Sequence, residues 1–190
     1  HGVPGAFMSL IGHNALAQAI KARKLSDPVT ILVHLDKTVY STLHDKNRGS
    51  KVKDGMDIGL CVWDKNRNYI EFSGAYINLY IIRNGIVYEY PGQKYIIGQE
   101  WKDDHLPLDM LTKKRITVFP GDIVCMTTDG YYDQFGGTKD KKMKRSRFKE
   151  VIKMFNNLSL PGQYSLLSDY FYNWKGDSEQ VDDILVMWFR

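Results

Sequence analysis

The spacing of apolar residues changes along the chain and marks out successive kinds of element. Residues 4–23 carry apolar side chains three and four positions apart, a spacing that predicts an amphipathic helix. Residues 28–43 repeat this spacing directly after Asp27 and Pro28, and this pair is typical of a helix start. We therefore expect two helices at the beginning of the chain.

The next part of the chain has short aromatic and β-branched runs, which favour strands. Strands are expected at 57–63, 68–73, 78–83 and 86–90. Asn84-Gly85 lies between the last two runs and predicts a tight hairpin turn. The runs at 115–119 and 122–128 flank Pro120-Gly121 and look like a further strand pair.

The C-terminal part returns to helical spacing at 144–156 and 161–174. Residues 183–189 are continuously apolar, which predicts a strand buried on both faces. The order of helices, strands, helices and strand indicates an α+β fold with separate layers rather than βαβ winding. No linker divides the chain, so we expect a single domain over residues 1–190.

Composition excludes several classes of protein. With 43% hydrophobic and 25% charged residues, the chain has a normal globular balance and is not mainly disordered. The net charge of +4 does not by itself require a nucleic-acid partner. Cys61 and Cys125 lie in apolar runs without a CxxC pattern, which indicates reduced core thiols. No run reaches the roughly 18 to 20 apolar residues of a membrane span.

Two acidic sites lie at predicted strand ends. Asp129 follows the apolar run that ends at Met126, and Asp182-Asp183 precedes the last strand. A carboxylate in such a place is costly unless it is hydrogen-bonded, paired or bound to a metal. Mg²⁺ and Mn²⁺ prefer oxygen ligands, so two acidic strand ends at one edge could hold such an ion. The alternative is that Asp129-Gly130 forms an ordinary turn and Asp182 caps a loop.

A basic segment at 139–149 also has two interpretations. It could recognise phosphate or acidic groups, or it could be a solvated loop that leads into a helix. We expect Lys141, Lys142, Lys144 and Arg145 to lie on an exposed segment away from the core. The histidines show no zinc-binding spacing and are expected to be packing or surface residues.

Five segments resemble, in the same order, the SpoIIE branch of the protein phosphatase 2C superfamily. These segments are HGVPGAFMSLIG (1–12), DGMDIGLCVWD (54–64), FSGAYINLYIIRNG (72–85), FPGDIVCMTTDGYYDQFGG (119–137) and QVDDILVMWF (180–189). The resemblance implies a four-layer α-β-β-α sandwich of two antiparallel sheets flanked by helices. It implies a metal-dependent protein-serine/threonine phosphatase, in which a hydroxide bound to Mn²⁺ or Mg²⁺ attacks the phosphoryl group. The resemblance also implies that no protein side chain acts as the nucleophile.

The resemblance also assigns roles to individual residues. Asp129 and Asp182 match metal ligands, while Gly130, Asp133 and Asp183 fall in or beside the ligand set. The family's first metal-binding Asp and opening strands precede His1, so we expect a domain truncated at its N-terminus. Whether such a fragment binds two metal ions is left open, and a catalytically silent module that binds a regulatory partner is the alternative function.

Partners and location follow from the same resemblance. The expected substrate is a phosphoprotein such as an anti-sigma-factor antagonist, and an upstream sensor or receiver domain is expected in the full-length protein. A nucleic-acid-binding domain is the weakest interpretation, and no nucleic acid is expected as a partner. The domain is expected in the cytoplasm without membrane contact of its own, even where the full-length protein is membrane-anchored.

Overall fold

The computed structural model describes residues 2–44, 55–99 and 111–190. Asp54, His1 and His105 therefore lie outside the described residues. The chain divides into two compact units. Unit 1 contains the residues up to Ile77 together with Pro91–Val118, and unit 2 contains Asn78–Tyr90 together with Phe119–Arg190.

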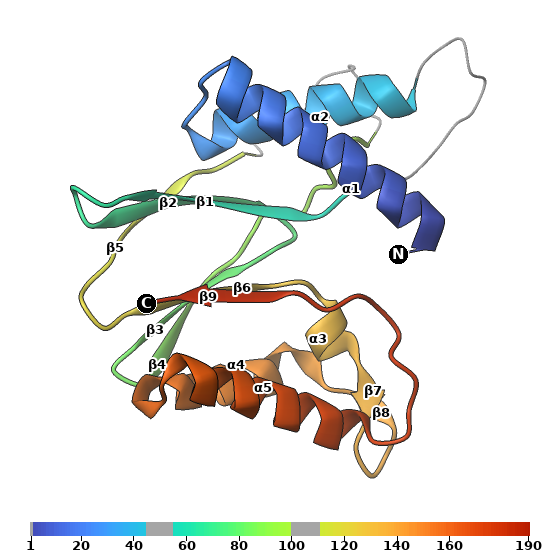
Figure 1. Ribbon diagram of the computed structural model, residues 1–190, viewed down its shortest axis with the longest axis vertical. Helices are drawn as coiled ribbons and strands as arrows, with labels where there is room; N and C mark the ends of the chain where they lie inside the picture. Colours follow the sequence, from blue (N-terminus) through green and yellow to red (C-terminus); the bar gives the residue numbers. More distant parts are fainter. Residues whose placement is uncertain (1, 45–54, 100–110) are drawn as a thin grey trace. The chain divides into compact units, whose positions relative to one another are not determined.

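Unit 1 is a three-stranded antiparallel sheet with helices on one face (Figure 1). The strand order is β1-β2-β5, with β1 at Ile58–Asp64, β2 at Tyr69–Ala75 and β5 at Lys114–Thr117. The helices are α1 (Gly2–Ala17), which continues into the short π-helix η1 (Gln18–Ala22), and α2 (Pro28–Leu43). The two predicted helices are thus confirmed. The apolar face expected for the first helix is not, because Phe7, Leu10 and Ile20 are 63%, 57% and 51% exposed.

The start of α2 shows why this helix forms where it does. The Asp27 side chain accepts a hydrogen bond from the Thr30 backbone N–H at 2.9 Å, and Pro28 occupies the first turn. Leu32, Leu35 and Val39 recur on one side of the helix and are completely buried. Their burial anchors α2 in the core of unit 1.

Unit 2 holds a four-stranded antiparallel sheet of order β4-β3-β6-β9. The strands are β3 (Leu79–Arg83), β4 (Ile86–Tyr90), β6 (Ile123–Thr127) and β9 (Val186–Phe189). The helices are α3 (Gly130–Asp133), α4 (Lys144–Lys153) with the 3₁₀ turn η3 (Met154–Asn157), and α5 (Leu160–Lys175). A small hairpin of β7 (Phe135–Gly136) and β8 (Lys141–Lys142) lies between α3 and α4 (Figure 1).

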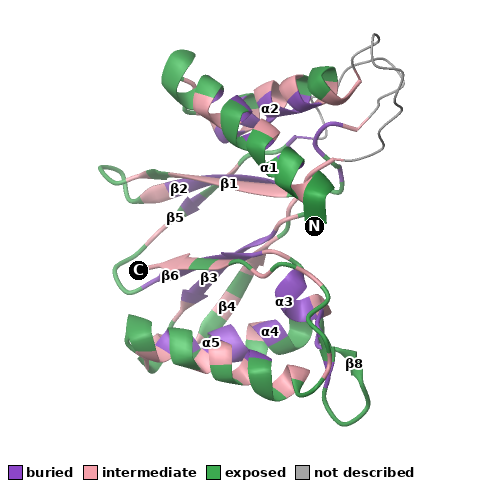
Figure 2. Cartoon of the chain, turned by 45° about the vertical axis from the view of Figure 1, so that its right-hand side comes forward, coloured by how far each residue is buried: buried purple, intermediate pink, exposed green. Residues whose placement is uncertain are grey.

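The core of unit 2 lies between its sheet and helices α4 and α5. Phe148, Val151 and Ile152 of α4 are completely buried and pack in one cluster with Leu167 and Phe171 of α5. Figure 2 shows α3 largely buried and the β7–β8 hairpin largely exposed. The α+β class with antiparallel sheets flanked by helices is therefore confirmed.

The Asn84-Gly85 hairpin is confirmed as well. Both residues have positive φ, at 51° and 73°, as a type I′ turn requires. The turn joins β3 to β4 in the register Arg83↔Ile86. The local sequence was sufficient here because two-residue hairpins depend on the turn residues themselves.

The predicted pairing of 115–119 with 122–128 is wrong. The first run forms β5 and pairs with β2, while the second forms β6 and pairs with β3 and β9. Between them, Asp122 donates its backbone N–H to the Phe119 carbonyl at 3.0 Å, and Gly121 has a φ of 93°. This is the geometry of a type II turn, which splays the flanking strands and carries the chain into another sheet.

The expectation that 183–189 is buried on both faces is also wrong. Only Val186–Phe189 form β9, and this strand lies at the edge of its sheet with β6 as its neighbour. Leu185 is 62% exposed and Met187 is 50% exposed. A continuous apolar run does not distinguish an edge strand from a central one, because pairing is decided by distant residues.

No helix among the described residues is both long and apolar enough to cross a membrane.

The turn before β6 generates a stability prediction. The Asp122 carboxylate, 2% exposed, accepts hydrogen bonds from Arg83 Nε at 2.9 Å and from the Phe119 N–H at 2.9 Å. Asp122→Ala leaves these donors without their acceptor, so we expect the free energy of unfolding to fall by about 2–3 kcal/mol. Urea unfolding followed by circular dichroism measures the change.

The control for this variant is Arg67→Ala. Arg67 lies 3.9 Å from Asp64 in an exposed ion pair, so its loss should cost less than about 1 kcal/mol. Equal destabilisation by the two variants would contradict the structural role given to Asp122.

Candidate metal centre at the ends of two strands

The register of β6 and β9 brings the two acidic segments to the same end of the sheet in unit 2. The strands are antiparallel and pair Thr127 with Val186, so the end of β6 lies beside the start of β9. Asp129 follows β6, and Asp182 and Asp183 precede β9. More than fifty residues of sequence separate these acidic groups. The pairing of β6 with β9 nevertheless places the two segments next to each other in space.

Hydrogen bonds of Thr128 connect the two segments beyond the last paired residues of β6 and β9. Its backbone N–H donates to the Leu185 carbonyl at 3.0 Å, and the Leu185 N–H donates to the Thr128 hydroxyl at 3.0 Å. The same hydroxyl lies 3.3 Å from the Asp183 carbonyl oxygen, to which it donates. The hydroxyl thus acts as donor and acceptor at once and fixes the chain on both sides of Ile184.

Gly130 packs closely against the second acidic segment. A Cβ atom at this position would lie 2.3 Å from the Asp183 carbonyl oxygen and 3.4 Å from Cβ of Asp182. The first distance is shorter than any van der Waals contact, so only glycine fits. Asp129 is adjacent to this contact in sequence, so the backbone segments that carry Asp129 and Asp182 lie side by side.

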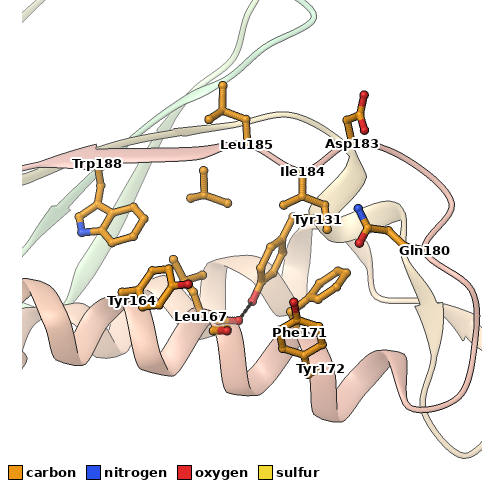
Figure 3. A pocket seen from close by; sticks show the side chains of 12 residues that line it. Tyr131, Tyr164, Leu167, Phe171, Tyr172, Gln180, Asp183, Ile184, Leu185 and Trp188 are labelled. Atoms are coloured by element: carbon orange, nitrogen blue, oxygen red, sulfur yellow. Dashed lines mark hydrogen bonds between the residues drawn. The ribbon is translucent and has the colours of Figure 1, made fainter. Parts of the chain in front are cut away.

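The carboxyl group of Asp182 is oriented by its own neighbour. The Asp183 backbone N–H donates to Asp182 Oδ1 at 2.7 Å, and Gln180 Nε2 donates to the Asp182 carbonyl at 2.8 Å. Asp183 itself points away from α5 (Figure 3). The two consecutive carboxylates therefore have different surroundings, and only Asp182 has its carboxylate held by a backbone donor.

The carboxylate of Asp133 is already paired with a cation. Its carboxylate forms an ion pair with Lys142 of β8 at 2.6 Å, and this pairing raises the pKa of Lys142. Its backbone N–H donates to the Asp129 carbonyl at 2.8 Å across the single turn of α3. A metal ion at Asp133 would have to compete with the Lys142 ammonium, so this residue is a weaker candidate ligand than Asp129.

The site rests on a packed aromatic base. Tyr131, which is buried, donates its hydroxyl to the Leu167 carbonyl of α5 at 2.8 Å (Figure 3). Burial raises the pKa of this phenol, so it stays protonated and available as a donor. A pocket of about 540 Å³ lies beside this contact, between α5 and residues 183–188. The hydrogen bond from Tyr131 to Leu167 therefore attaches the short helix α3 to the much longer helix α5.

Sequence reasoning missed Gln134 and Trp174. The Gln134 side chain is completely buried and donates to the Glu179 carbonyl at 2.8 Å, which fixes the loop that leads to Asp182. The Gln134 carbonyl accepts from Trp174 Nε1 at 3.1 Å and from the Met143 N–H at 3.0 Å. The sequence signal that could have identified Gln134 is a polar residue among the aromatic residues that follow Asp129, and this signal is weak.

The donor chemistry suits a hard cation. Asp129 and Asp182 offer carboxylate oxygens, which Mg²⁺ and Mn²⁺ prefer over nitrogen and sulfur. No group of three or more His, Cys, Asp and Glu side chains is arranged to hold a metal within residues 2–44, 55–99 and 111–190. Mg²⁺ commonly completes a coordination sphere that contains only one or two carboxylates with water and substrate oxygens.

Neither cysteine is suited to act as a nucleophile. Burial raises the pKa of Cys61 to about 11 and that of Cys125 to about 12. Both thiols therefore remain protonated at neutral pH, whereas thiol catalysis needs the thiolate. The described chain offers no activated thiol for a covalent phosphoenzyme.

Comparisons with known proteins identify the family of this chain. The family model "Stage II sporulation protein E (SpoIIE)" matches residues 1–190. A comparison with curated proteins finds no match.

Solved structures show the same fold. The SiaA-PP2C domain of Pseudomonas aeruginosa matches with a TM-score of 0.86 and 29% identity, over 100% of this chain and 71% of that chain. The PP2C phosphatase domain of SpoIIE from Bacillus subtilis, with a fragment of its regulatory domain, gives 0.70 and 18%, over 99% and 50%. PppA of Pseudomonas aeruginosa gives 0.62 and 17%, over 96% and 78%.

The family model spans the whole chain, and the fold is that of PP2C phosphatase domains. The chain belongs to the stage II sporulation protein E (SpoIIE) family and is a protein-serine/threonine phosphatase domain of the PP2C type.

Proposed function

We propose that this domain hydrolyses phosphoserine or phosphothreonine on a protein in bacterial signalling, with Mn²⁺ or Mg²⁺ held by Asp129 and Asp182. The contact of Gly130 with the Asp183 carbonyl supports the proposal, because it holds two acidic segments that are distant in sequence side by side. We further propose that the two units act as the single domain that the sequence predicts.

The bound metal ions would supply a hydroxide near neutral pH and would neutralise the phosphoryl oxygens. The protein's own residues position that chemistry. The Asp183 N–H holds the Asp182 carboxylate in one orientation, and the Thr128 hydroxyl fixes the backbone between the two acidic segments. Lys142 neutralises Asp133, which limits the negative charge beside the proposed metal ions.

A silent binding module is the second candidate function. The observation that favours it is the absence of a three-ligand metal cluster within the part of the chain that the structure describes. Mn²⁺-dependent release of phosphate from a simple aryl phosphate separates the two functions, since only the enzyme turns this compound over. Binding of a partner without such turnover would favour the silent module.

The proposed partners follow from the family. A phosphoprotein of the anti-sigma-factor antagonist class is the proposed substrate, and a sensor or receiver domain is the proposed upstream regulator. No nucleic-acid partner is proposed. The free thiols of Cys61 and Cys125 fit a reducing compartment, so we propose a cytoplasmic location for the domain.

The first test of the proposed function replaces a metal ligand. Asp129→Asn removes a negative charge and a strong metal donor, so we expect Mn²⁺-dependent phosphatase activity of the full-length protein to fall by at least about 100-fold. A phosphate-release assay on a phosphoserine peptide measures the rate. The matched control is Asp169→Asn on the exposed side of α5, which should leave the rate unchanged. Wild-type activity in Asp129→Asn would contradict the proposed metal site.

The second test concerns the contact at Gly130. Gly130→Ala places a methyl group against the Asp183 carbonyl, so the two acidic segments must move apart. We expect the free energy of unfolding to fall by about 1–3 kcal/mol, as for overpacking. We also expect turnover to fall about tenfold or more, since small displacements at catalytic sites have large effects.

Gly162→Ala in the first turn of α5 is the control for this test. Its Cβ would meet its nearest neighbour at 3.4 Å, an ordinary contact, and alanine is favoured over glycine in helices by about 1 kcal/mol. This control should be as stable as the wild type or slightly more stable. If Gly130→Ala behaved like Gly162→Ala in both assays, the steric argument would fail.

A further inference from the structure

The segment that follows the candidate metal centre is strongly basic. Residues 139–149 contain one acidic residue, Asp140, and a series of cations. The cations are Lys139, Lys141, Lys142, Lys144, Arg145, Arg147 and Lys149. Lys141, Lys142, Lys144 and Arg145 are exposed, as the sequence predicts. The prediction that all four avoid the core is wrong for Arg145, whose guanidinium lies 5.1 Å from the ring of the buried Tyr132.

These cations surround a pocket rather than a flat surface. A pocket of about 470 Å³ lies between the β7–β8 hairpin, the start of α4 and the end of α5. Its basic lining residues are Lys139, Lys141, Lys142, Lys144 and Arg147. Because α4 begins at Lys144, the partial positive charge of a helix N-terminus adds to these side chains. We therefore expect the pocket to attract anionic groups.

Much of this charge has no acidic partner among the residues that the structure describes. Lys142 pairs with Asp133, and Lys149, which lies outside the pocket, pairs with Glu89. Within the residues that the structure describes, Lys141 and Lys144 form no ion pair. Cations held close together without counter-charges repel each other, and an anionic ligand would relieve that repulsion.

The wall of the pocket is fixed in place. The Gly137 N–H donates to the Trp174 carbonyl at 2.7 Å, and the Trp174 indole N–H donates to the Gln134 carbonyl. The Arg147 guanidinium lies 4.5 Å from the Trp174 ring centroid. The hairpin is therefore attached to the end of α5, so the cations are presented by a preformed surface.

The position of the basic pocket relative to Asp129 indicates which anion it would bind. The Lys142–Asp133 ion pair joins the pocket to the last residue of α3, four residues beyond Asp129. Four residues of helix rise by about 6 Å. An extended peptide advances by about 3.3 Å per residue, so two to four residues span from the metal centre into the pocket.

The Trp174 ring argues against nucleic acid as the occupant. Arg147 lies over this ring, and a Cβ at Gly137 would be 3.0 Å from its atoms, so Gly137 packs against it too. A ring with these neighbours has little surface on which a base could stack, and stacking supports much of the affinity for single strands. An acidic peptide, in contrast, would bind through its charges to the cations and needs no free aromatic ring face.

We propose that this basic pocket docks acidic residues two to four positions from the phosphoserine or phosphothreonine of the substrate protein. This inference rests on the proposed phosphatase function and adds a sequence preference to it. The pocket selects substrates by charge, while the metal centre carries out hydrolysis. Lys142 links the two, since it lines the pocket and pairs with Asp133.

The test compares two phosphoserine peptides of equal length in the full-length protein. One peptide carries Asp at the positions two to four residues from the phosphoserine, and the other carries Ala there. We expect the wild type to prefer the acidic peptide in kcat/KM by about tenfold at low salt, the effect of a few exposed ion pairs. The preference should shrink as salt is added, because exposed charges are screened.

The double variant Lys141→Glu/Lys144→Glu should abolish or reverse this preference. Lys142 is left intact because it pairs with Asp133. Lys65→Glu/Lys153→Glu is the control of equal charge, since both residues are exposed and neither lines the pocket. An unchanged preference in the pocket variant, or equal loss in the control, would overturn the docking proposal.

Two further measurements separate this proposal from the proposed function. Fluorescence anisotropy with a labelled, unphosphorylated acidic peptide reports docking without turnover, and the pocket variant should weaken this binding about tenfold. Absence of Mn²⁺-dependent aryl phosphate turnover in the wild type would overturn the phosphatase function, while peptide binding would still decide the docking proposal. Tighter binding of a single-stranded oligonucleotide than of the acidic peptide would overturn the choice of occupant.

Discussion

The structure of the site depends on one steric constraint, the contact between Gly130 and the Asp183 carbonyl. The β6–β9 register brings the two acidic segments to one end of the sheet, and the Thr128 hydrogen bonds hold them there. The absence of a side chain at Gly130 then allows the backbones to touch. A side chain at this position would push apart the two segments that carry Asp129 and Asp182.

The proposed metal centre and the proposed docking pocket share the same structural support. Gln134 fixes the loop that leads to Asp182 through its side chain, and its carbonyl holds Trp174 and the hairpin. The amide lies fully buried directly after α3, so it connects the candidate metal centre to the basic pocket. A domain organised in this way can vary the charges of its hairpin without altering its acidic strand ends.

The sequence predicted those features that depend on neighbouring residues. The Asp27 helix start and the Asn84-Gly85 turn were confirmed because capping and turn chemistry act over a few positions. The predictions from sequence failed where residues far apart in the chain decide how strands pair. The type II turn at Pro120-Gly121 carries the chain into another sheet, and an apolar run does not reveal that β9 lies at an edge. The resemblance to a family, rather than the spacing of residues, supplied the proposed metal roles of Asp129 and Asp182.

The most direct test is to locate the cation. Crystals of the full-length protein soaked in Mn²⁺ should show anomalous density with carboxylate oxygens of Asp129 and Asp182 at about 2.0–2.6 Å, the range of metal–oxygen bonds to hard cations. Asp182→Asn crystals soaked in the same way should show weaker density, because a charged ligand is lost. Density bound elsewhere in the molecule, with Asp129 and Asp182 free of metal, would contradict the account.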